Sequence, residues 1–290
     1  MMQIIADWGS SNLRAYLLAE GQVVGRERSD LGTKRVLSED LDFAEVLRGV
    51  IGALGCAEDT PVQLSGMVGA KNGWVDAGYL DTPVSPAGLA PALVAASNFP
   101  SAKIVPGLRH TASDGSVDLM RGEEVQVFGL LSIAPDARTV CLPGTHSKWV
   151  RVEGGEISSF ESYMTGDLFA SLSEGSIFKE QVGSLELDEA SFLDGCELAY
   201  GGCSLDRLFR LRSDYVRGAV SPDGFSSYLS GFLIANEIRA ASPSGSVYLC
   251  GSPQLARSYS IALEKFSLDS AEIDLEAATV AGHLAIRPSI

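Results

Sequence analysis

The sequence predicts an α/β protein with a duplicated architecture, in which mixed sheets are covered by helices. The stretch from Gln3 to Ser29 reads as three consecutive strands joined by tight turns, and a helical segment and a further buried strand follow it. This order indicates a mixed sheet rather than a strict alternation of strands and helices. The stretch from Thr139 to Tyr163 repeats the pattern of strand, glycine-containing turn and strand. A pattern that recurs in each half of a chain is typical of a duplicated fold.

The first half of the chain is organised around this early strand hairpin. One strand ends at Asp7, a second spans Leu13–Ala19, and a third starts at Gln22. Ser38 is a candidate N-cap for a helix with apolar residues at helical spacing, and "PVQLSGM" reads as the next strand. Residues 68–106 are rich in Gly, Pro, Ala and Ser but too apolar for a disordered linker, so we expect an ordered, functional loop.

The second half is mainly helical outside its own hairpin. We expect an amphipathic helix that begins near Asp118, within "DLMRGEEVQVFGLLSIA". The stretch "SVYLCGSPQLA" predicts a strand, a glycine corner and a helix with Pro253 in its first turn. Further helices are expected over residues 165–174, 204–211, 225–240 and 276–285.

Composition and charge exclude several classes of partner. The chain has 290 residues, 46% of them hydrophobic, and can bury a substantial core. Its formal net charge of -15 argues against nucleic acid or an anionic membrane surface as a partner, because either requires a basic face. The sequence shows no secretory signal and no apolar run long enough for a bilayer, which predicts a cytoplasmic protein. The five cysteines lack paired spacing, so neither a disulfide framework nor a zinc site is indicated.

Familiar catalytic motifs are absent from the sequence, including G-x-x-x-x-G-K-[ST], H-E-x-x-H and G-x-S-x-G. His146 and Ser147 are neighbours in an expected strand and would point to opposite faces, so we reject a nucleophile–base pair. What remains is a set of three turns, "DWGSSN", "PGTHS" and "CGSP", each at the end of a strand. Backbone N–H groups and hydroxyls at such turns can bind phosphate.

Three stretches, "ADWGSSNLRAYL", "LPGTHSKWV" and "LCGSPQLA", resemble the two phosphate segments and the adenosine segment of the actin-like ATPase and sugar kinase superfamily. With "SGMVGAKNGW", "DLMRGEEVQVFG" and "SYMTGDLFASL", the chain resembles the 2-dehydro-3-deoxygalactonokinase family over nearly its whole length. The resemblance implies two duplicated ribonuclease H-like domains, each with a mixed five-stranded sheet flanked by helices, and ATP in the cleft between them. It places the sugar-acid side in residues 1–117 and the nucleotide side in residues 118–290, and the last helix could pack back on the first domain.

The resemblance also implies ATP and Mg²⁺ as cofactors. Asp7 would hold Mg²⁺ through water, although it could also cap its own turn. The two turns would bind the phosphates of ATP, and the glycine corner would approach the adenosine. The residues concerned are Gly9, Ser10, Ser11 and Asn12 in the first turn, Gly144, Thr145, His146 and Ser147 in the second, and Gly251 and Ser252 at the corner.

Phosphoryl transfer further needs a carboxylate that accepts the proton of the substrate hydroxyl. The candidates are Asp114, Asp118, Glu123 and Glu124. By resemblance, the base precedes a helix that enters the cleft, so we prefer Asp118, with Glu123 as the runner-up; Asp118 could instead cap the helix. Arg121 could reach the substrate or pair with Glu124. Gly122 within a helix would be unfavourable, which indicates close approach by a ligand or by backbone.

A sugar-acid carboxylate requires a cation in so acidic a protein. Lys71 can supply one as a point charge, although it could equally be a solvated loop lysine. The expected substrate contacts are Lys71, Asn72, Gly73, Trp74 and Thr165, of which Thr165 could also simply begin a helix.

The resulting hypothesis is an ATP- and Mg²⁺-dependent kinase that phosphorylates the 6-hydroxyl of 2-dehydro-3-deoxy-D-galactonate in galactonate catabolism. Its partners would be small molecules, and a homodimer is an open alternative. Three other functions stay open: a kinase of another sugar or keto-deoxy sugar acid, a non-catalytic actin-like nucleotide-binding regulator, and a phosphatase or polyphosphate hydrolase.

Overall fold

The structure is a computed structural model that describes residues 2–287, and its contacts divide the chain into two compact units. The first unit contains the described residues up to Asp136, Val152–Phe160 and those from Asp274 onward. The second unit contains Ala137–Arg151 and Glu161–Ile273. Residues 118–136 therefore belong to the first unit, whereas the resemblance placed them in the second domain.

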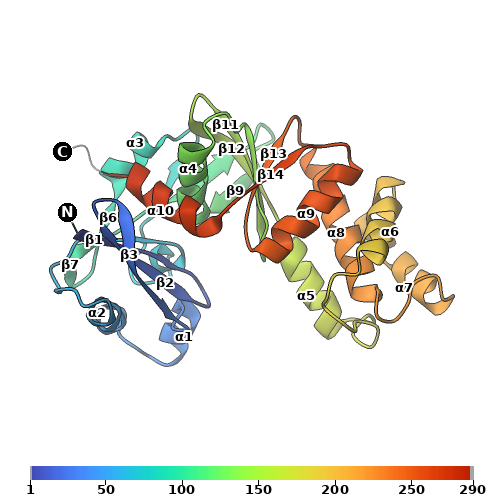
Figure 1. The fold of residues 1–290 in the computed structure, drawn as a ribbon, viewed down its shortest axis with the longest axis horizontal. Helices are drawn as coiled ribbons and strands as arrows, with labels where there is room; N and C mark the ends of the chain where they lie inside the picture. Colours follow the sequence, from blue (N-terminus) through green and yellow to red (C-terminus); the bar gives the residue numbers. More distant parts are fainter. Residues whose placement is uncertain (1, 288–290) are drawn as a thin grey trace. The chain divides into compact units, whose positions relative to one another are not determined.

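The larger sheet of the first unit is mixed and has six strands in the order β3-β2-β1-β4-β7-β6 (Figure 1). These are β1 (Met2–Trp8), β2 (Leu13–Ala19), β3 (Gln22–Ser29), β4 (Val62–Ser65), β6 (Val94–Ala96) and β7 (Phe99–Ile104). Five strands were expected, and the sixth, β6, comes from the segment read as a loop. Asn98 adopts a left-handed conformation (φ 57°), which closes a tight turn and lets β6 pair antiparallel with β7.

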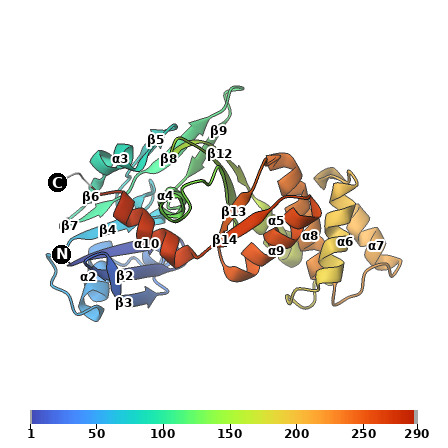
Figure 2. The ribbon, with the colours of Figure 1, turned by 45° about the horizontal axis from the view of Figure 1, so that its top comes forward.

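A small sheet and several helices complete the first unit. The small sheet has the order β5-β8-β9, with β5 (Tyr79–Asp81), β8 (Gly107–Thr111) and β9 (Val117–Met120). The helices are α1 (Thr33–Ser38), α2 (Phe43–Ala53), α3 (Pro86–Leu89), α4 (Glu123–Ile133) and α10 (Leu275–Ala285), with 3₁₀ turns η1 (Met67–Gly69) and η2 (Ala90–Ala92). Helices α4 and α10 lie side by side (Figure 2). Their backbones meet at Gly129, where a Cβ atom would lie 1.7 Å from the carbonyl oxygen of Ala278.

The second unit combines most of a five-stranded sheet with a group of helices; residues Val152–Phe160 of this sheet are counted with the first unit. The sheet has the order β12-β11-β10-β13-β14, with β10 (Thr139–Leu142), β11 (Ser147–Glu153), β12 (Glu156–Tyr163), β13 (Val247–Cys250) and β14 (Ser270–Ile273). The helices are α5 (Thr165–Gly175), α6 (Glu189–Tyr200), α7 (Phe209–Val216), α8 (Phe225–Ala241) and α9 (Pro253–Lys265), with the 3₁₀ turn η3 (Leu205–Arg207). Helices α6 and α8 touch backbone to backbone, since a Cβ atom at Gly231 would lie 2.0 Å from the carbonyl oxygen of Phe192.

The same pairing occurs around the hairpin of each sheet. Strand β1 pairs antiparallel with β2 and parallel with β4, and β10 pairs antiparallel with β11 and parallel with β13. In each sheet a helix-containing segment joins the hairpin to the parallel neighbour, as a parallel connection requires. The carboxyl end of the first hairpin strand therefore lies beside the carboxyl end of a parallel strand in both sheets.

Most predicted elements are confirmed, including β2 and the long helix α8, but three helices begin elsewhere than expected. The helix expected over residues 204–211 is instead the 3₁₀ turn η3 followed by α7, which begins at Phe209. The helix expected near Asp118 begins at Glu123, because Asp118 is paired with His110 in β9 and Gly122 has a φ of 98° that no helix contains. Helix α2 is capped by Asp42, whose side chain accepts from the backbone N–H of Glu45, and not by Ser38. Among the described residues, no helix combines the length and apolar character needed to cross a membrane.

Candidate functional site

The first turn, residues 9–12, is held in one conformation by backbone hydrogen bonds. The N–H of Gly9 donates to the carbonyl of Asn12 at 2.9 Å, which closes the turn between β1 and β2. The N–H of Thr33, at the start of α1, donates to the carbonyl of Gly9 at 3.0 Å. Ser11 is exposed. The structure thus brings the four predicted phosphate-binding residues together in a braced turn.

Asp7 stands immediately before this turn and is the first element of an acidic site. Its side chain is 21% exposed, and its Oδ2 lies 4.0 Å from Nη1 of Arg14, the residue opposite it in β2. Burial raises the pKa of Asp7 to about 6; the positive charge of Arg14 lowers this pKa, and the negative charge of Glu123 raises it further. Asp7 is therefore mostly buried but still accessible to solvent, and the charge of a second carboxylate influences its pKa.

Two glycines allow α4 to approach Asp7. Gly66, after β4, has a φ of 92°, and a Cβ atom there would lie 2.9 Å from the carbonyl oxygen of Trp8 and 3.0 Å from Oδ1 of Asp7. Gly122, before α4, has a φ of 98°, and its Cβ atom would lie 3.0 Å from the Cα atom of Gly66. Side chains at these positions would be strained and would push the segments apart. The sequence analysis expected close approach at Gly122, and the approaching group is backbone.

The N-terminus of α4 presents two carboxylates that accept hydrogen bonds from the two residues immediately before the helix. Glu123 Oε2 accepts from the N–H of Arg121 at 3.0 Å, and Glu124 Oε2 accepts from the N–H of Gly122 at 2.7 Å. Glu124 is fully buried, and this burial, together with the neighbouring Glu123, raises its pKa to about 8. The two residues differ in exposure. Glu123 is half-buried and its charge raises the pKa of Asp7, whereas Glu124 is buried away from water.

Asp118 and Arg121 occupy other surroundings than those expected. Asp118 lies in β9 of the small sheet, and Asp7 senses Arg14 and Glu123 among the described charges. Arg121 is buried, its Nη2 donates to the carbonyl of Gly78 at 2.7 Å, and its guanidinium lies 4.4 Å from the ring centre of Tyr79. These contacts favour a packing role for Arg121.

The second turn, residues 143–146, meets the start of a helix as the first turn does. The N–H of Asp167 in α5 donates to the carbonyl of Thr145 at 3.0 Å, and a Cβ atom at Gly166 would lie 2.5 Å from the carbonyl oxygen of Gly144. Thr145 and His146 are exposed. The hydroxyl of Ser147 was expected to bind phosphate, but it is buried in the core and donates to Glu237 at 3.1 Å. This correction follows from strand alternation, which turns residue 147 inward.

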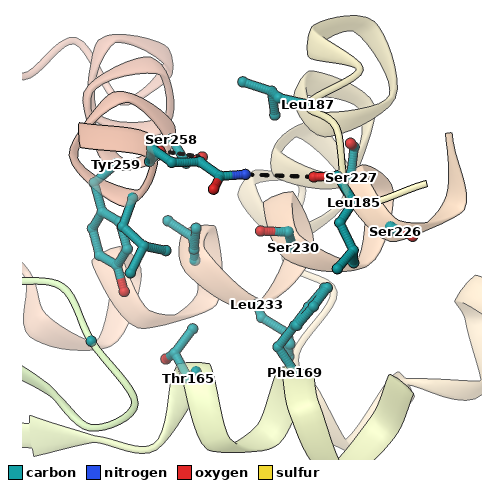
Figure 3. Close-up of a pocket in the computed structure, with 15 residues that line it drawn as sticks. Thr165, Phe169, Leu185, Leu187, Ser226, Ser227, Ser230, Leu233, Ser258 and Tyr259 are labelled. Carbon is teal, nitrogen blue, oxygen red and sulfur yellow. Dashed lines mark hydrogen bonds between the residues drawn. The ribbon is translucent and has the colours of Figure 1, made fainter. Parts of the chain in front are cut away.

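A cavity of about 250 Å³ lies inside the second unit (Figure 3). Apolar side chains and a few hydroxyls form its wall, and Gly144 of the second turn reaches it. The lining residues outside the turn are Thr165, Gly166 and Phe169 from α5, Leu185 and Leu187, Ser226, Ser227, Ser230, Leu233 and Ile234 from α8, and Gln254, Leu255, Ser258 and Tyr259 from α9. An apolar pocket with a few convergent polar groups is typical of a small-molecule site.

Of two residues predicted to bind ligands, one lines this cavity and the other caps a helix beside it. Thr165 was expected to contact the sugar acid, but it lines the cavity of the second unit. Ser252 was expected to contact adenosine; its hydroxyl caps α9 by accepting from the N–H of Leu255 at 3.4 Å, next to Gly251. The next two residues after Pro253 lie in the cavity wall instead.

The predicted substrate residues of the loop are either exposed or partly buried. Lys71 and Asn72 are exposed. Gly73 packs against backbone, since a Cβ atom there would lie 2.5 Å from the carbonyl oxygen of Val68. Trp74 belongs to an aromatic cluster, with ring centres 6.3 Å from Trp8, 6.0 Å from Phe43 and 6.1 Å from Phe99. Gly73 and Trp74 thus make packing contacts while remaining partly exposed, and their role as substrate contacts stays a prediction.

Sequence reasoning missed Gly66, Arg14 and the cavity wall. Gly66 carried a usable signal, since it follows a buried strand in "QLSGM" as Gly9 follows β1. Among the described residues no group of three or more His, Cys, Asp or Glu side chains could hold a metal ion. One accessible carboxylate is nevertheless the donor set that Mg²⁺ commonly uses, because it retains waters and takes further oxygens from substrate phosphates.

The fold defines an α/β protein of the actin-like ATPase class. The activator of 2-hydroxyisocaproyl-CoA dehydratase from Clostridium difficile, solved with bound ADPNP, shares this fold with a TM-score of 0.53 and 14% identity, over 98% of this chain and 93% of that chain. Within this class, a family model described as 2-keto-3-deoxy-galactonokinase matches residues 7–286, and the chain belongs to this family.

Similar proteins carry the corresponding enzyme name. Probable 2-dehydro-3-deoxygalactonokinase DgoK1 of Rhizobium meliloti (strain 1021) is 32% identical over 95% of this chain and 93% of its own length. The 2-dehydro-3-deoxygalactonokinase of Escherichia coli (strain K12) is 34% identical over 81% of this chain and 78% of its own length. A solved structure from Sinorhizobium meliloti, provisionally named as the same enzyme, matches with a TM-score of 0.90 and 30% identity, over 98% of this chain and 97% of that chain.

Proposed function

We propose that the protein transfers the γ-phosphoryl group of ATP to the 6-hydroxyl of 2-dehydro-3-deoxy-D-galactonate. The P–O bond to ADP breaks, a P–O bond to the sugar oxygen forms, and the hydroxyl proton passes to a carboxylate. The observation that carries this proposal is the enclosed carboxylate Asp7 before a braced turn, with Glu123 close enough to raise its pKa. Family membership supplies the substrate.

Glu123 is the general base that the geometry favours. It is half-buried, it begins α4, and its Oε2 is held by the N–H of Arg121, which fixes the carboxylate without neutralising it. Its charge raises the pKa of Asp7, so the two carboxylates lie close enough to belong to one site. Asp118 stays the alternative base, and its place in β9 gives it no described effect on Asp7.

Asp7 is the residue that would hold Mg²⁺, through water, beside the first turn. The ion, when bound, would neutralise charge on the phosphate oxygens. The backbone N–H groups of Ser10, Ser11 and Asn12 and the hydroxyls of the two serines would bind the transferred phosphate. Arg14, opposite Asp7, adds a positive charge in a protein of net charge -15.

Nucleotide binding is assigned to the second unit. Gly144 and Thr145 of the second turn would bind phosphate, and the adjoining cavity would take the adenosine. The repeated pairing around β1 and β10 supports two duplicated actin-like domains. The position of ATP between the domains, and the boundary at residue 117, remain predictions of the resemblance.

The sugar-acid carboxylate would be bound by Lys71 and Asn72, the two exposed residues of the predicted substrate loop. Lys71 lies in the first unit, which also contains Asp7 and Glu123. A cytoplasmic location, the absence of nucleic-acid partners and a homodimer remain predictions.

The test is acceptor-dependent ADP release with Mg-ATP. The panel contains 2-dehydro-3-deoxy-galactonate, its gluconate epimer, galactose, glucose and no acceptor. Turnover that is strongest with the galactonate compound is the expected result. Turnover with another sugar alone would contradict the substrate, and ADP release without any acceptor would indicate a hydrolase.

A further inference from the structure

A buried carboxylate lies directly behind the second turn, and neither the sequence motifs nor the proposed chemistry uses it. Glu237 of α8 is 3% exposed. Its Oε1 accepts from Nε1 of Trp149 at 2.7 Å, and its Oε2 accepts from the hydroxyls of Tyr259 at 2.8 Å and Ser147 at 3.1 Å. The hydroxyl of Thr165 is a fourth donor. One carboxylate thus holds four side chains.

The donors come from separate elements that build the nucleotide side of the second unit. Ser147 is the first residue after the second turn, and Thr165 begins α5, whose N-terminus braces that turn. Tyr259 belongs to α9, and both Tyr259 and Thr165 line the cavity. Glu237 is therefore bonded to the turn on one side and to two walls of the cavity on the other.

The geometry of the cluster indicates a carboxyl group that organises its surroundings. A buried carboxylate is costly unless donors satisfy it, and an apolar side chain of similar size is often at least as stabilising. All four donors are neutral, and they lower the pKa of Glu237 against the dominant effect of burial, which raises it. Four donors that converge on two oxygens fix the directions of their elements, as apolar contacts would not.

We propose that Glu237 is the positioning residue of the nucleotide site. By binding Ser147, Thr165 and Tyr259 at once, it keeps the second turn and the cavity walls in the single arrangement that accepts phosphate and base together. This inference rests on the proposed assignment of the nucleotide to the second unit.

The central experiment compares Glu237→Gln with a matched control. Glutamine has the same size as glutamate, but its NH₂ group is itself a donor and replaces one of the two oxygens that accept hydrogen bonds from the surrounding N–H and O–H groups. The control is Asp214→Asn: Asp214 is also a buried carboxylate of the second unit, bonded to Tyr228, Arg210 and Arg217, and it does not line the cavity. Calorimetric Kd values for ADP and for a non-hydrolysable ATP analogue, the KM for the sugar acid and thermal unfolding are measured on the full chain.

We expect Glu237→Gln to weaken nucleotide binding by about tenfold or more, the effect of losing hydrogen bonds to a charged group. Asp214→Asn should lower the Tm but leave the nucleotide Kd within about twofold, since it disturbs the unit away from the cavity. The sugar-acid KM should stay unchanged in both. Equal losses of nucleotide affinity in the two variants, or wild-type affinity in Glu237→Gln, would overturn the inference.

A second pair of variants keeps the test decisive if Glu237→Gln does not fold. Ser147→Ala removes the bond beside the turn, and Trp149→Phe removes a bond from a core residue that lines neither turn nor cavity. Nucleotide affinity should fall several-fold in the first variant alone, and a fall in both would contradict positioning. If the wild-type protein binds no nucleotide, the proposed function fails; if it binds and no variant differs, only this inference fails.

Discussion

The two hairpin turns have the same backbone frame and different chemical surroundings. Each follows a buried strand with one antiparallel and one parallel neighbour, and each is braced by the N-terminus of a helix. In the first turn the hairpin pairs Asp7 with Arg14, and in the second it pairs Leu142 with Lys148. The first turn adjoins the acidic start of α4, whereas the second adjoins an apolar cavity.

This difference shows how a repeated element can divide the work of one reaction. In the proposed function, the backbone N–H groups of both turns would bind phosphate, because the frame presents such groups at each turn. The carboxylates and the cavity come from other segments that pack beside each turn. We therefore expect changes near the first turn to alter the chemical step and changes near the second to alter nucleotide binding.

The largest expected effect is a loss of kcat when the proposed base in the first unit is replaced. Glu123→Gln should lower kcat by roughly a hundredfold or more, because the proton acceptor is lost, while the Kd for ATP stays nearly unchanged. Steady-state kinetics and calorimetry measure the two quantities. Asp118→Asn is the companion variant and should retain most of the activity; a larger loss in Asp118→Asn than in Glu123→Gln would return the role of base to Asp118.

The next effect concerns the second unit. Ser230→Phe places a ring in the cavity of about 250 Å³ and should raise the KM for ATP by about tenfold or more through steric exclusion. The KM for the sugar acid should not change. Ser230→Ala removes only the hydroxyl and is the matched control. Unaltered ATP kinetics in Ser230→Phe would show that the base binds elsewhere.

Each unit contains a buried carboxylate, and the one in the first unit should make the free energy of unfolding depend on pH. Glu124 has one oxygen without a hydrogen-bond partner among the described residues, whereas Glu237 accepts four. Because burial raises the pKa of Glu124 from 4.5 to about 8, the folded state keeps a proton that the unfolded state releases. This contribution is complete below about pH 4.5 and is lost as pH rises through 8, with a slope of at most about 1.4 kcal/mol per pH unit. Denaturant unfolding should show this slope in wild type and a flatter profile in Glu124→Gln; identical profiles would contradict it.

The smallest expected effect tests the substrate loop. Lys71→Met should raise the KM for the sugar acid by about fivefold through loss of a single exposed charge, and leave the KM for ATP unchanged. Lys179→Met, an exposed lysine of the second unit, is the control and should change neither KM. Equal rises in both KM values for Lys71→Met would refute carboxylate recognition by Lys71.

Local patterns in the sequence determined the strands, both turns and the family. Short continuous apolar runs before Asp7 and before Pro143 predict buried strands, and small polar residues after them predict turns. These signals are short-range, so a single sequence suffices to find them. The same holds for α8 and for the helix that Pro253 begins.

Only the tertiary structure decided which side chains meet. Pairing of Asp118 in β9 and the positive φ of Gly122 moved the start of α4 to Glu123, which brought that carboxylate to Asp7. Packing buried Ser147 in the core and placed Trp74 in an aromatic cluster, although both stand beside polar turn residues. Periodicity reports whether a residue is buried, but its partners come from distant segments of the chain, and their contacts form only when the sheets and helices pack.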